Sequence, residues 1–231
     1  MPGSDPLRTV LFDLDGTLAD TAPDMYAALA ALQREQGVPI LPFEAVRNQV
    51  SHGGAALVRL AFPDAEGDRF ETLRQRFLTL YAEHYLCRDT GLFPGMETLL
   101  DTIERLGMNW GIVNNKPAWL TDPLVRAMDL HQRAVTVISG DTTPQRKPHP
   151  MPMLLACEQA ACQPAECLYV GDAERDIQAG RAAGTHTLVA LYGYIDDPQA
   201  PATWGADGAI DHPEQILPWL PAESRVGITS Q

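Results

Sequence analysis

Short runs of apolar and β-branched residues alternate with longer segments of helical periodicity over most of the chain. The runs lie at residues 9–12, 109–113, 135–139, 167–170 and 186–190. Segments of helix length separate the last four runs, at residues 119–129, 150–162 and 174–183. A repeated order of strand, helix and strand is typical of a parallel sheet with helices on both faces. We therefore predict an α/β fold with a doubly wound, Rossmann-like parallel-sheet core.

The long stretch between the first and second runs has only helical periodicity. Met25, Leu29 and Leu32 fall on one helix face, at spacings of three and four residues. A small all-helical cap, inserted after the first strand, accounts for this pattern. We expect residues 7–19 and 92–222 to form the α/β catalytic core, residues 20–91 the helical cap, and residues 223–231 a loose tail.

Composition and charge narrow the possible partners. The chain has 231 residues, 45% of them hydrophobic, and a formal net charge of −13. Such a charge disfavours nucleic acids and anionic membranes as partners, because both require a cationic surface. The sequence contains no apolar run of about 20 residues, the length that spans a bilayer. We expect a cytoplasmic protein, either a monomer or a homodimer, and we expect its four cysteines to be small buried thiols.

Polar residues follow the predicted strands at the edge where parallel sheets bind ligands. They are Asp13, Asp15, Asn114, Asn115, Lys147, Asp172 and Asp176. Taken singly, each has an ordinary explanation, such as an Asp-Gly turn, a solvated lysine or an acid in the first turn of a helix. Together, the clustered carboxylates would repel one another unless a cation lay among them. Oxygen ligands without histidine or thiolate favour a hard ion, so we expect Mg²⁺.

The motifs resemble those of the haloacid dehalogenase superfamily of phosphatases. The resemblance rests on the segments 10–18, 147–148 and 171–176, on their order, and on the helical insert between the first two motifs. It implies catalytic roles for Asp13 as nucleophile, Asp15 as general acid and base, and Lys147 as the neutralising charge. It also implies a metal site formed by Asp13, Asp15, Asp172 and Asp176, in which Asp15 contributes its backbone carbonyl. The usual threonine or serine of the second motif is replaced by Asn114, whose longer amide reaches a phosphoryl group differently.

The resemblance implies a Mg²⁺-dependent phosphomonoesterase that acts through an aspartyl phosphate on a small phosphorylated metabolite. The phosphoglycolate phosphatase-like branch is the most similar, and within it the bacterial N-acetylmuramic acid 6-phosphate phosphatases. A 2-phosphoglycolate phosphatase, a phosphosugar mutase of the same superfamily and a non-catalytic phosphate-binding module are the alternatives. We expect Asn114, Asn115, His52 and Gly53 to contact the substrate. Trp204 is expected either to stack on a sugar or to pack on the core.

Overall fold

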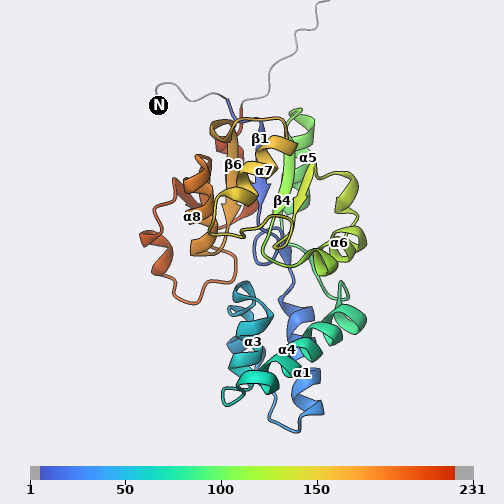
Figure 1. Ribbon diagram of the computed structural model, residues 1–231. Helices are drawn as coiled ribbons and strands as arrows, with labels where there is room; N and C mark the ends of the chain where they lie inside the picture. The colour runs from blue at the N-terminus through green and yellow to red at the C-terminus, as the bar shows by residue number, and fades with distance from the viewer. Residues whose placement is uncertain (1–5, 222–231) are drawn as a thin grey trace, which may run out of the picture.

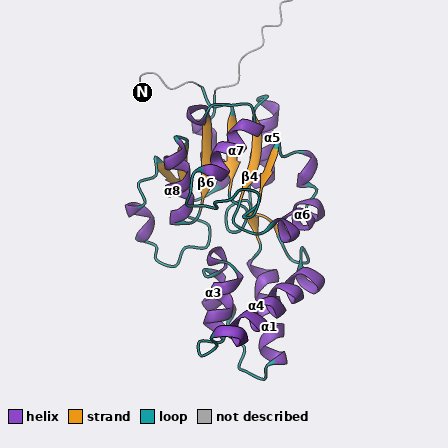
Figure 2. Cartoon of the chain, viewed as in Figure 1, coloured by secondary structure: helices purple, strands orange, loops and turns teal. Residues whose placement is uncertain are grey.

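A parallel sheet of six strands forms the centre of the protein. The computed structural model describes residues 6–221. The strands run in the order β5-β4-β1-β6-β7-β8, and all neighbours pair in parallel (Figure 2). Their bounds are β1 (Thr9–Phe12), β4 (Asn109–Val113), β5 (Thr136–Ile138), β6 (Cys167–Gly171), β7 (His186–Ala190) and β8 (Gly208–Ile210). The central position of β1 places the residues that follow it in the middle of one sheet edge.

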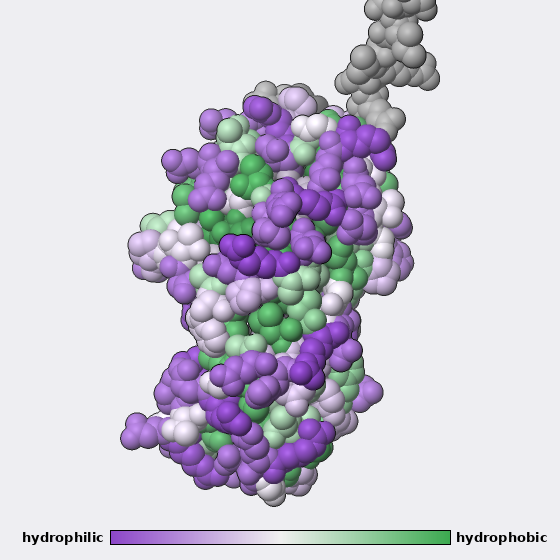
Figure 3. All heavy atoms as spheres, turned by 90° about the vertical axis from the view of Figure 1, so that its right-hand side faces the viewer, coloured by the Kyte–Doolittle hydropathy of each residue, from purple (hydrophilic) through white to green (hydrophobic). Residues whose placement is uncertain are grey.

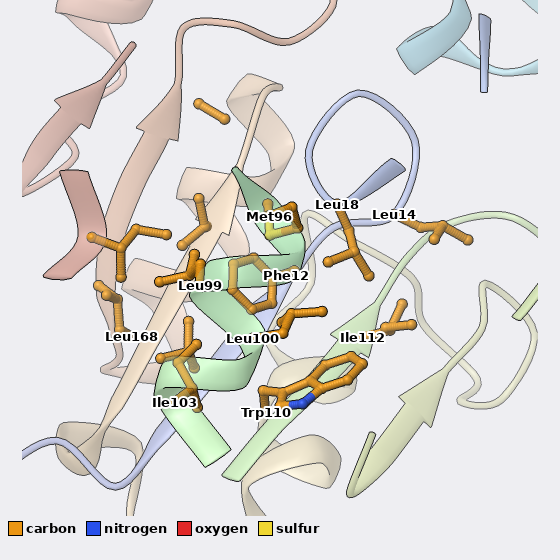
Figure 4. Packing of buried hydrophobic residues seen from close by; sticks show 14 of the residues in the cluster. Phe12, Leu14, Leu18, Met96, Leu99, Leu100, Ile103, Trp110, Ile112 and Leu168 are labelled. Carbon is orange, nitrogen blue, oxygen red and sulfur yellow. The ribbon is translucent and has the colours of Figure 1, made fainter. Parts of the chain in front are cut away.

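Helices cover both faces of this sheet. Side chains alternate between the faces along a strand, so Val10 and Phe12 pack with α5, whereas Leu11 packs with α7 on the opposite face. Figure 4 shows Phe12 beside Leu99 and Leu100 of α5. The helices of the core are α5 (Met96–Arg105), α6 (Ala118–Ala127), η3 (Leu130–Gln132), α7 (Met151–Gln159), η4 (Pro164–Glu166), α8 (Glu174–Ala183), η5 (Ala200–Thr203) and η6 (Pro213–Trp219).

A helical insert separates β1 from β4 and lies beyond the carboxyl ends of the strands (Figure 1). Its apolar cluster includes Met25, Leu29, Leu32 and Phe77 and extends to Phe93, Leu120 and Tyr194 outside the insert. Figure 3 shows the insert as a second lobe, joined to the sheet lobe at a narrower waist. Its elements are α1 (Ala22–Glu35), α2 (Phe43–Arg47), η1 (Val50–His52), α3 (Gly54–Ala61), α4 (Gly67–Leu80) and the π-helix η2 (Tyr81–Tyr85).

The chain enters and leaves the insert at one place. The short strands β2 (Ala19–Asp20) and β3 (Gly91–Leu92) pair there in antiparallel register. Beside them, the buried carboxylate of Asp24 accepts hydrogen bonds from the backbone amides of Arg88, Asp89 and Thr90, at 2.9 to 3.0 Å. The outgoing and returning segments are therefore tied to each other at this junction.

The predicted fold class is confirmed, and the differences are local. The helix expected at residues 150–162 ends at Gln159, because Ala161 has a left-handed backbone (φ 51°) that stops it. The short strands β2, β3 and β8 were not expected, since two or three residues carry no measurable alternation. The division into core and cap at residues 20 and 91 stays a prediction, and the tail at 223–231 lies outside the described residues. Within residues 6–221, no helix is both long and apolar enough to cross a membrane.

Candidate active site

Asp13 lies directly after β1, in a turn that exposes its carboxylate to the sheet edge. Its backbone amide donates to the carbonyl of Val170 at 2.9 Å, which continues the pairing of β1 with β6 for one more residue. One carboxylate oxygen accepts a hydrogen bond from the amide of Leu14 at 2.8 Å. Gly16 adopts a φ of +84°, and a Cβ there would collide with the carboxylate of Asp172. The turn therefore needs glycine for both its conformation and its close approach to Asp172.

Lys147 is buried among acidic groups and backbone oxygens. Its side chain is 0% exposed, and Nζ lies 2.9 Å from Asp13 Oδ1 and 2.7 Å from Asp176 Oδ1. Nζ also donates to the carbonyl of Val113 at 2.8 Å. Burial alone would lower the pKa of Lys147, but Asp13 and Asp176 raise it above its ordinary value. The residue therefore remains a fixed positive charge beside Asp13.

Three buried carboxylates meet beside this lysine. Oxygens of Asp13, Asp172 and Asp176 all lie within 4.8 Å of one another. Asp176 is oriented by the backbone amide of Ala173, which donates to its second oxygen at 2.9 Å. Asp172 accepts hydrogen bonds from Thr17 Oγ1 at 2.9 Å and from Ser51 Oγ at 2.6 Å. Ser51 belongs to η1 of the insert, so the insert touches the acidic cluster directly.

The carboxylates carry more negative charge than Lys147 balances. Burial raises the pKa of Asp13 from 3.8 to about 7. The positive charge of Lys147 opposes this increase, and the negative charges of Asp176 and Asp172 add to it. Burial and then Asp176 raise the pKa of Asp172 from 3.8 to about 6. An all-oxygen donor set with unbalanced buried charge fits a hard divalent cation such as Mg²⁺. Asp13 and Asp172 would hold the ion. Asp176 already binds Lys147 and the amide of Ala173, so it would keep Lys147 in position beside Asp13.

Magnesium is expected to stabilise the protein more at pH 8 than at pH 5. In the metal-free fold, Asp13 and Asp172 ionise near 7 and 6 rather than near 3.8. Their protonated forms therefore stabilise the fold fully below pH 3.8, and this contribution is lost as the pH rises to about 7. At about 100-fold excess over Kd, Mg²⁺ should raise Tm by about 5 to 10 °C at pH 8. Thermal unfolding at both pH values, with and without the ion, tests this, and an equal increase at both would contradict it.

Asp15 makes a separate ion pair that the sequence did not reveal. Its Oδ1 lies 2.7 Å from Lys116 Nζ and accepts a hydrogen bond from Thr21 Oγ1 at 2.6 Å. The same Nζ lies 3.3 Å from the hydroxyl of Tyr81 in η2 of the insert. Burial alone would lower the pKa of Lys116, but Asp15 and Tyr81 raise it above its ordinary value. The pair fixes the orientation of Asp15 and connects it to the insert.

The two asparagines after β4 make different contacts. Asn114 is buried; its amide nitrogen donates to the carbonyl of Ile138 at 3.1 Å, and its amide oxygen accepts from the backbone amide of Lys116 at 2.7 Å. Both ends of the amide are thus engaged by the backbone, and the expected contact of Asn114 with the substrate stays a prediction. Asn115 donates to the carbonyl of Lys147 at 3.0 Å and lines the cavity described next. It ties the second motif to the lysine segment.

A cavity of about 440 Å³ opens above Asp13 and Asp15. Its lining includes His52 and Gly53 of the insert and Lys147 of the core; contact of His52 and Gly53 with a substrate stays a prediction. Its cationic side chains are Arg74, Lys116, Arg146, Lys147 and Arg175. Of these five, the sequence analysis identified only Lys147 as a site residue. Arg146 could have been found too, because it is adjacent to Lys147 in the sequence. Trp204 lines a second cavity of about 350 Å³, which shares Ser51, His52 and Arg175 with the first.

His52→Ala is expected to raise KM for the natural ester about fivefold, the value of one hydrogen bond, and to leave p-nitrophenyl phosphate turnover unchanged. His52 Nε2 lies 3.1 Å from Asp196 Oδ2, and the half-exposed ring lines the cavity where the alcohol part of a substrate would lie. Steady-state kinetics on both esters test this. His84→Ala, an exposed histidine of the same insert, is the matched control. A similar change for both esters would show that His52 does not select the substrate.

Comparisons with known proteins give similar sequences and similar folds. A model of the family described as haloacid dehalogenase-like hydrolase matches residues 10–190. Phosphoglycolate phosphatase of Xanthomonas campestris pv. campestris is 42% identical over 215 residues, 93% of this chain and 96% of that protein. N-acetylmuramic acid 6-phosphate phosphatase of Pseudomonas putida is 43% identical over 211 residues, 91% of this chain and 94% of that protein. The crystal structure of a predicted phosphoglycolate phosphatase from Haemophilus somnus superposes with a TM-score of 0.82 at 26% identity, covering 94% of this chain and 99% of that one.

Proposed function

The chain belongs to the haloacid dehalogenase-like hydrolases and is a phosphoric monoester hydrolase, and we propose that it acts through an aspartyl phosphate on N-acetylmuramic acid 6-phosphate. The observation that carries the mechanism is the contact of Asp13 Oδ1 with Lys147 Nζ at 2.9 Å, on the floor of a cavity that also exposes Asp15. Such a carboxylate can attack the phosphorus of a bound ester and divide one displacement into two.

Asp13 and Asp15 divide the chemistry between them. The carboxylate of Asp13 forms a bond to phosphorus while the bond from phosphorus to the alcohol oxygen breaks. In its protonated form Asp15 gives a proton to that departing oxygen, and as the resulting carboxylate it then takes a proton from the water that hydrolyses the aspartyl phosphate. The fixed charge of Lys147 stabilises the negative charge that collects on the phosphoryl oxygens. Lys116 holds the Asp15 carboxylate in place between these two steps.

The oxygen donors of Asp13 and Asp172, with the backbone carbonyl of Asp15, form the proposed Mg²⁺ site. When bound, the ion supplies positive charge next to the phosphoryl oxygens. Thr17 and Ser51 hold Asp172 in position through their hydroxyl groups. Because Ser51 lies in the insert, correct placement of the insert and correct placement of this ligand depend on each other.

The size and lining of the cavity favour the larger of two candidate substrates. A volume of about 440 Å³ is in the range of sites that enclose a substituted sugar, whereas 2-phosphoglycolate is far smaller. Apolar side chains of Met25, Val50 and Leu78 line the cavity together with the cationic groups. These groups suit a sugar phosphate that also has an anionic substituent, as N-acetylmuramic acid 6-phosphate does. Phosphoglycolate is the second candidate, since relatives of both names are similar to this chain.

The substrate proposal is tested by kcat/KM for both esters with Mg²⁺. We expect N-acetylmuramic acid 6-phosphate to be preferred by at least about 100-fold, because the smaller ester leaves most of the cavity contacts unused. A preference for 2-phosphoglycolate would contradict the proposal. Inorganic phosphate should be released without any phosphorylated activator; a strict need for one, with phosphate returned to the sugar, would indicate a mutase instead.

Asp15→Asn is expected to slow hydrolysis of an alkyl ester about 100-fold more than hydrolysis of p-nitrophenyl phosphate. An alkoxide needs a proton to leave, whereas p-nitrophenolate does not, so only the first ester depends on the acid in the first step. Single-turnover kinetics isolate that step from hydrolysis of the intermediate. Thr21→Val, which removes a hydrogen bond to Asp15 but keeps the carboxylate, is the companion variant; it should slow the alkyl ester much less than Asp15→Asn does and leave p-nitrophenyl phosphate nearly unchanged. Equal losses in Asp15→Asn would remove the acid role.

A further inference from the structure

Three cysteines meet at the sheet edge opposite the active site. The sulfur atoms of Cys157, Cys162 and Cys167 all lie within 4.8 Å of one another. Their residues are 2%, 8% and 0% exposed. Cys167 begins β6, whereas Asp172 follows the end of that strand, so the two clusters are about 13 Å or more apart along the strand. The thiol cluster is therefore independent of the acidic cluster.

The local backbone explains why the first two sulfurs meet. Helix α7 ends in a reversal in which the amide of Cys162 donates to the carbonyl of Cys157, and the amide of Ala161 donates to that of Glu158, both at 3.1 Å. This pair of bonds is a Schellman motif, which characteristically brings the side chains of these two positions into contact. Ala161 accepts a left-handed φ of 51° to form it, at a position where glycine is usual. The motif fixes Cys162 over Cys157.

A fourth polar group faces the same point. Thr9 of β1 pairs directly with Cys167 of β6. Its side chain interacts with Cys162, yet its hydroxyl is fully buried and makes no hydrogen bond of acceptable geometry with any described residue. An unpartnered buried hydroxyl is costly. It would be satisfied by a ligand held between the sulfurs.

We propose that Cys157, Cys162 and Cys167 bind one thiophilic divalent cation of the Zn²⁺ class, with the hydroxyl of Thr9 as the fourth donor. Tetrahedral Zn²⁺ with bonds of about 2.3 Å to sulfur requires sulfurs about 3.8 Å apart, so the cluster needs to contract by about 1 Å at most. Binding replaces the three thiol protons, which go to solvent. The ion would join α7, the loop after it, β6 and β1. Sulfur donors also separate it chemically from Mg²⁺, which prefers oxygen.

The experiment is a Cd²⁺ titration of the reduced full-length protein in the presence of Mg²⁺. Cadmium bound to thiolates gives an ultraviolet charge-transfer band that carboxylate sites do not give. We expect the band to saturate at one ion per chain and Zn²⁺ to displace it. Cys162→Ser should weaken Cd²⁺ binding at least about 100-fold. Cys87→Ser, the fourth cysteine and outside the cluster, is the matched control and should bind as the wild type does. Hydrolysis of p-nitrophenyl phosphate by each variant confirms that it is folded.

A second variant tests the hydroxyl. Thr9→Val keeps the shape of the side chain, so it should raise Tm of the metal-free protein while it weakens Cd²⁺ binding about tenfold. Wild-type protein that shows no saturable thiolate band overturns the proposal without reference to any variant, and leaves the cysteines as packing groups of the core. The proposed site is also overturned if Cys162→Ser shows the same Cd²⁺ band as the wild type, or if Thr9→Val binds Cd²⁺ as tightly as the wild type does.

Discussion

Asp13→Asn should lower kcat by more than about 1,000-fold and still give a folded protein, since a catalytic nucleophile cannot be replaced by its amide without losses of that order. The amide has nearly the same shape as the carboxylate but does not attack phosphorus. It also removes one charge from a cluster in which burial raises the pKa of Asp13 to about 7. We therefore expect metal-free Asp13→Asn to unfold at a higher temperature than the wild type at pH 8.

Two measurements make this test specific. Mass spectrometry of rapidly quenched wild-type enzyme should find the phosphoryl group on the peptide that contains Asp13, and the variant should carry none. Asp64→Asn, which changes an exposed carboxylate of the insert in the same way, is the control and should keep full activity. Normal phosphate release by Asp13→Asn would exclude the aspartyl-phosphate mechanism.

Lys147→Met should lose activity to a similar extent and should also destabilise the fold. The side chain is 0% exposed and lies within 2.9 Å of both Asp13 and Asp176. Removing one member of a buried ion pair costs about 3 to 5 kcal/mol, because the other charge is left without a partner. Urea unfolding at pH 8 measures this loss. At pH 5 the loss of unfolding free energy should be smaller, because Asp13 and Asp172, whose pKa values are raised to about 7 and about 6, are then mostly protonated.

Lys116→Met is the matched comparison for this variant. The ammonium of Lys116 also pairs with a carboxylate, that of Asp15. The side chain of Asp15 is 16% exposed, so water can solvate it when the lysine is removed. We expect a smaller loss of stability than for Lys147→Met. Equal stability losses for the two variants, or no pH dependence for Lys147→Met, would show that Lys147 does not balance the acidic cluster.

The sequence was informative wherever a residue follows a strand of the parallel sheet. Asp13 and Asp172 each follow an apolar run, and the carboxyl ends of parallel strands share one edge of the sheet, so the two residues were expected to lie together. Lys116 was missed because it lies in what looks like an ordinary loop after β4, and only the fold shows that its side chain converges with that of Asp15. Asn114 was placed in the correct loop, but the direction of its side chain depends on the carbonyl of Ile138, which pattern alone does not locate.

The cysteines show the same limit of prediction from sequence. The five-residue spacing of Cys157, Cys162 and Cys167 is visible in the sequence, and burial, which was expected of all four cysteines, is confirmed for these three, whereas Cys87 is only partly buried. Spacing could not show that the sulfurs converge, because this depends on a helix end at Ala161 that lacks the usual glycine. Residues that share a strand edge are therefore predictable, whereas those joined by a helix terminus need the structure.

The junction where β2 pairs with β3 confines both crossings of the chain between the sheet and the helical insert to one place. Both crossings of the chain meet at one short ladder, and the carboxylate of Asp24 closes it by binding the returning backbone of residues 88–90. The insert also reaches the sheet edge directly, because Ser51 donates to Asp172 and the hydroxyl of Tyr81 lies 3.3 Å from Lys116 Nζ. A change of the insert that alters the cavity wall therefore also alters the support of Asp172 and of the lysine beside Asp15, so substrate range and catalytic power are expected to change together.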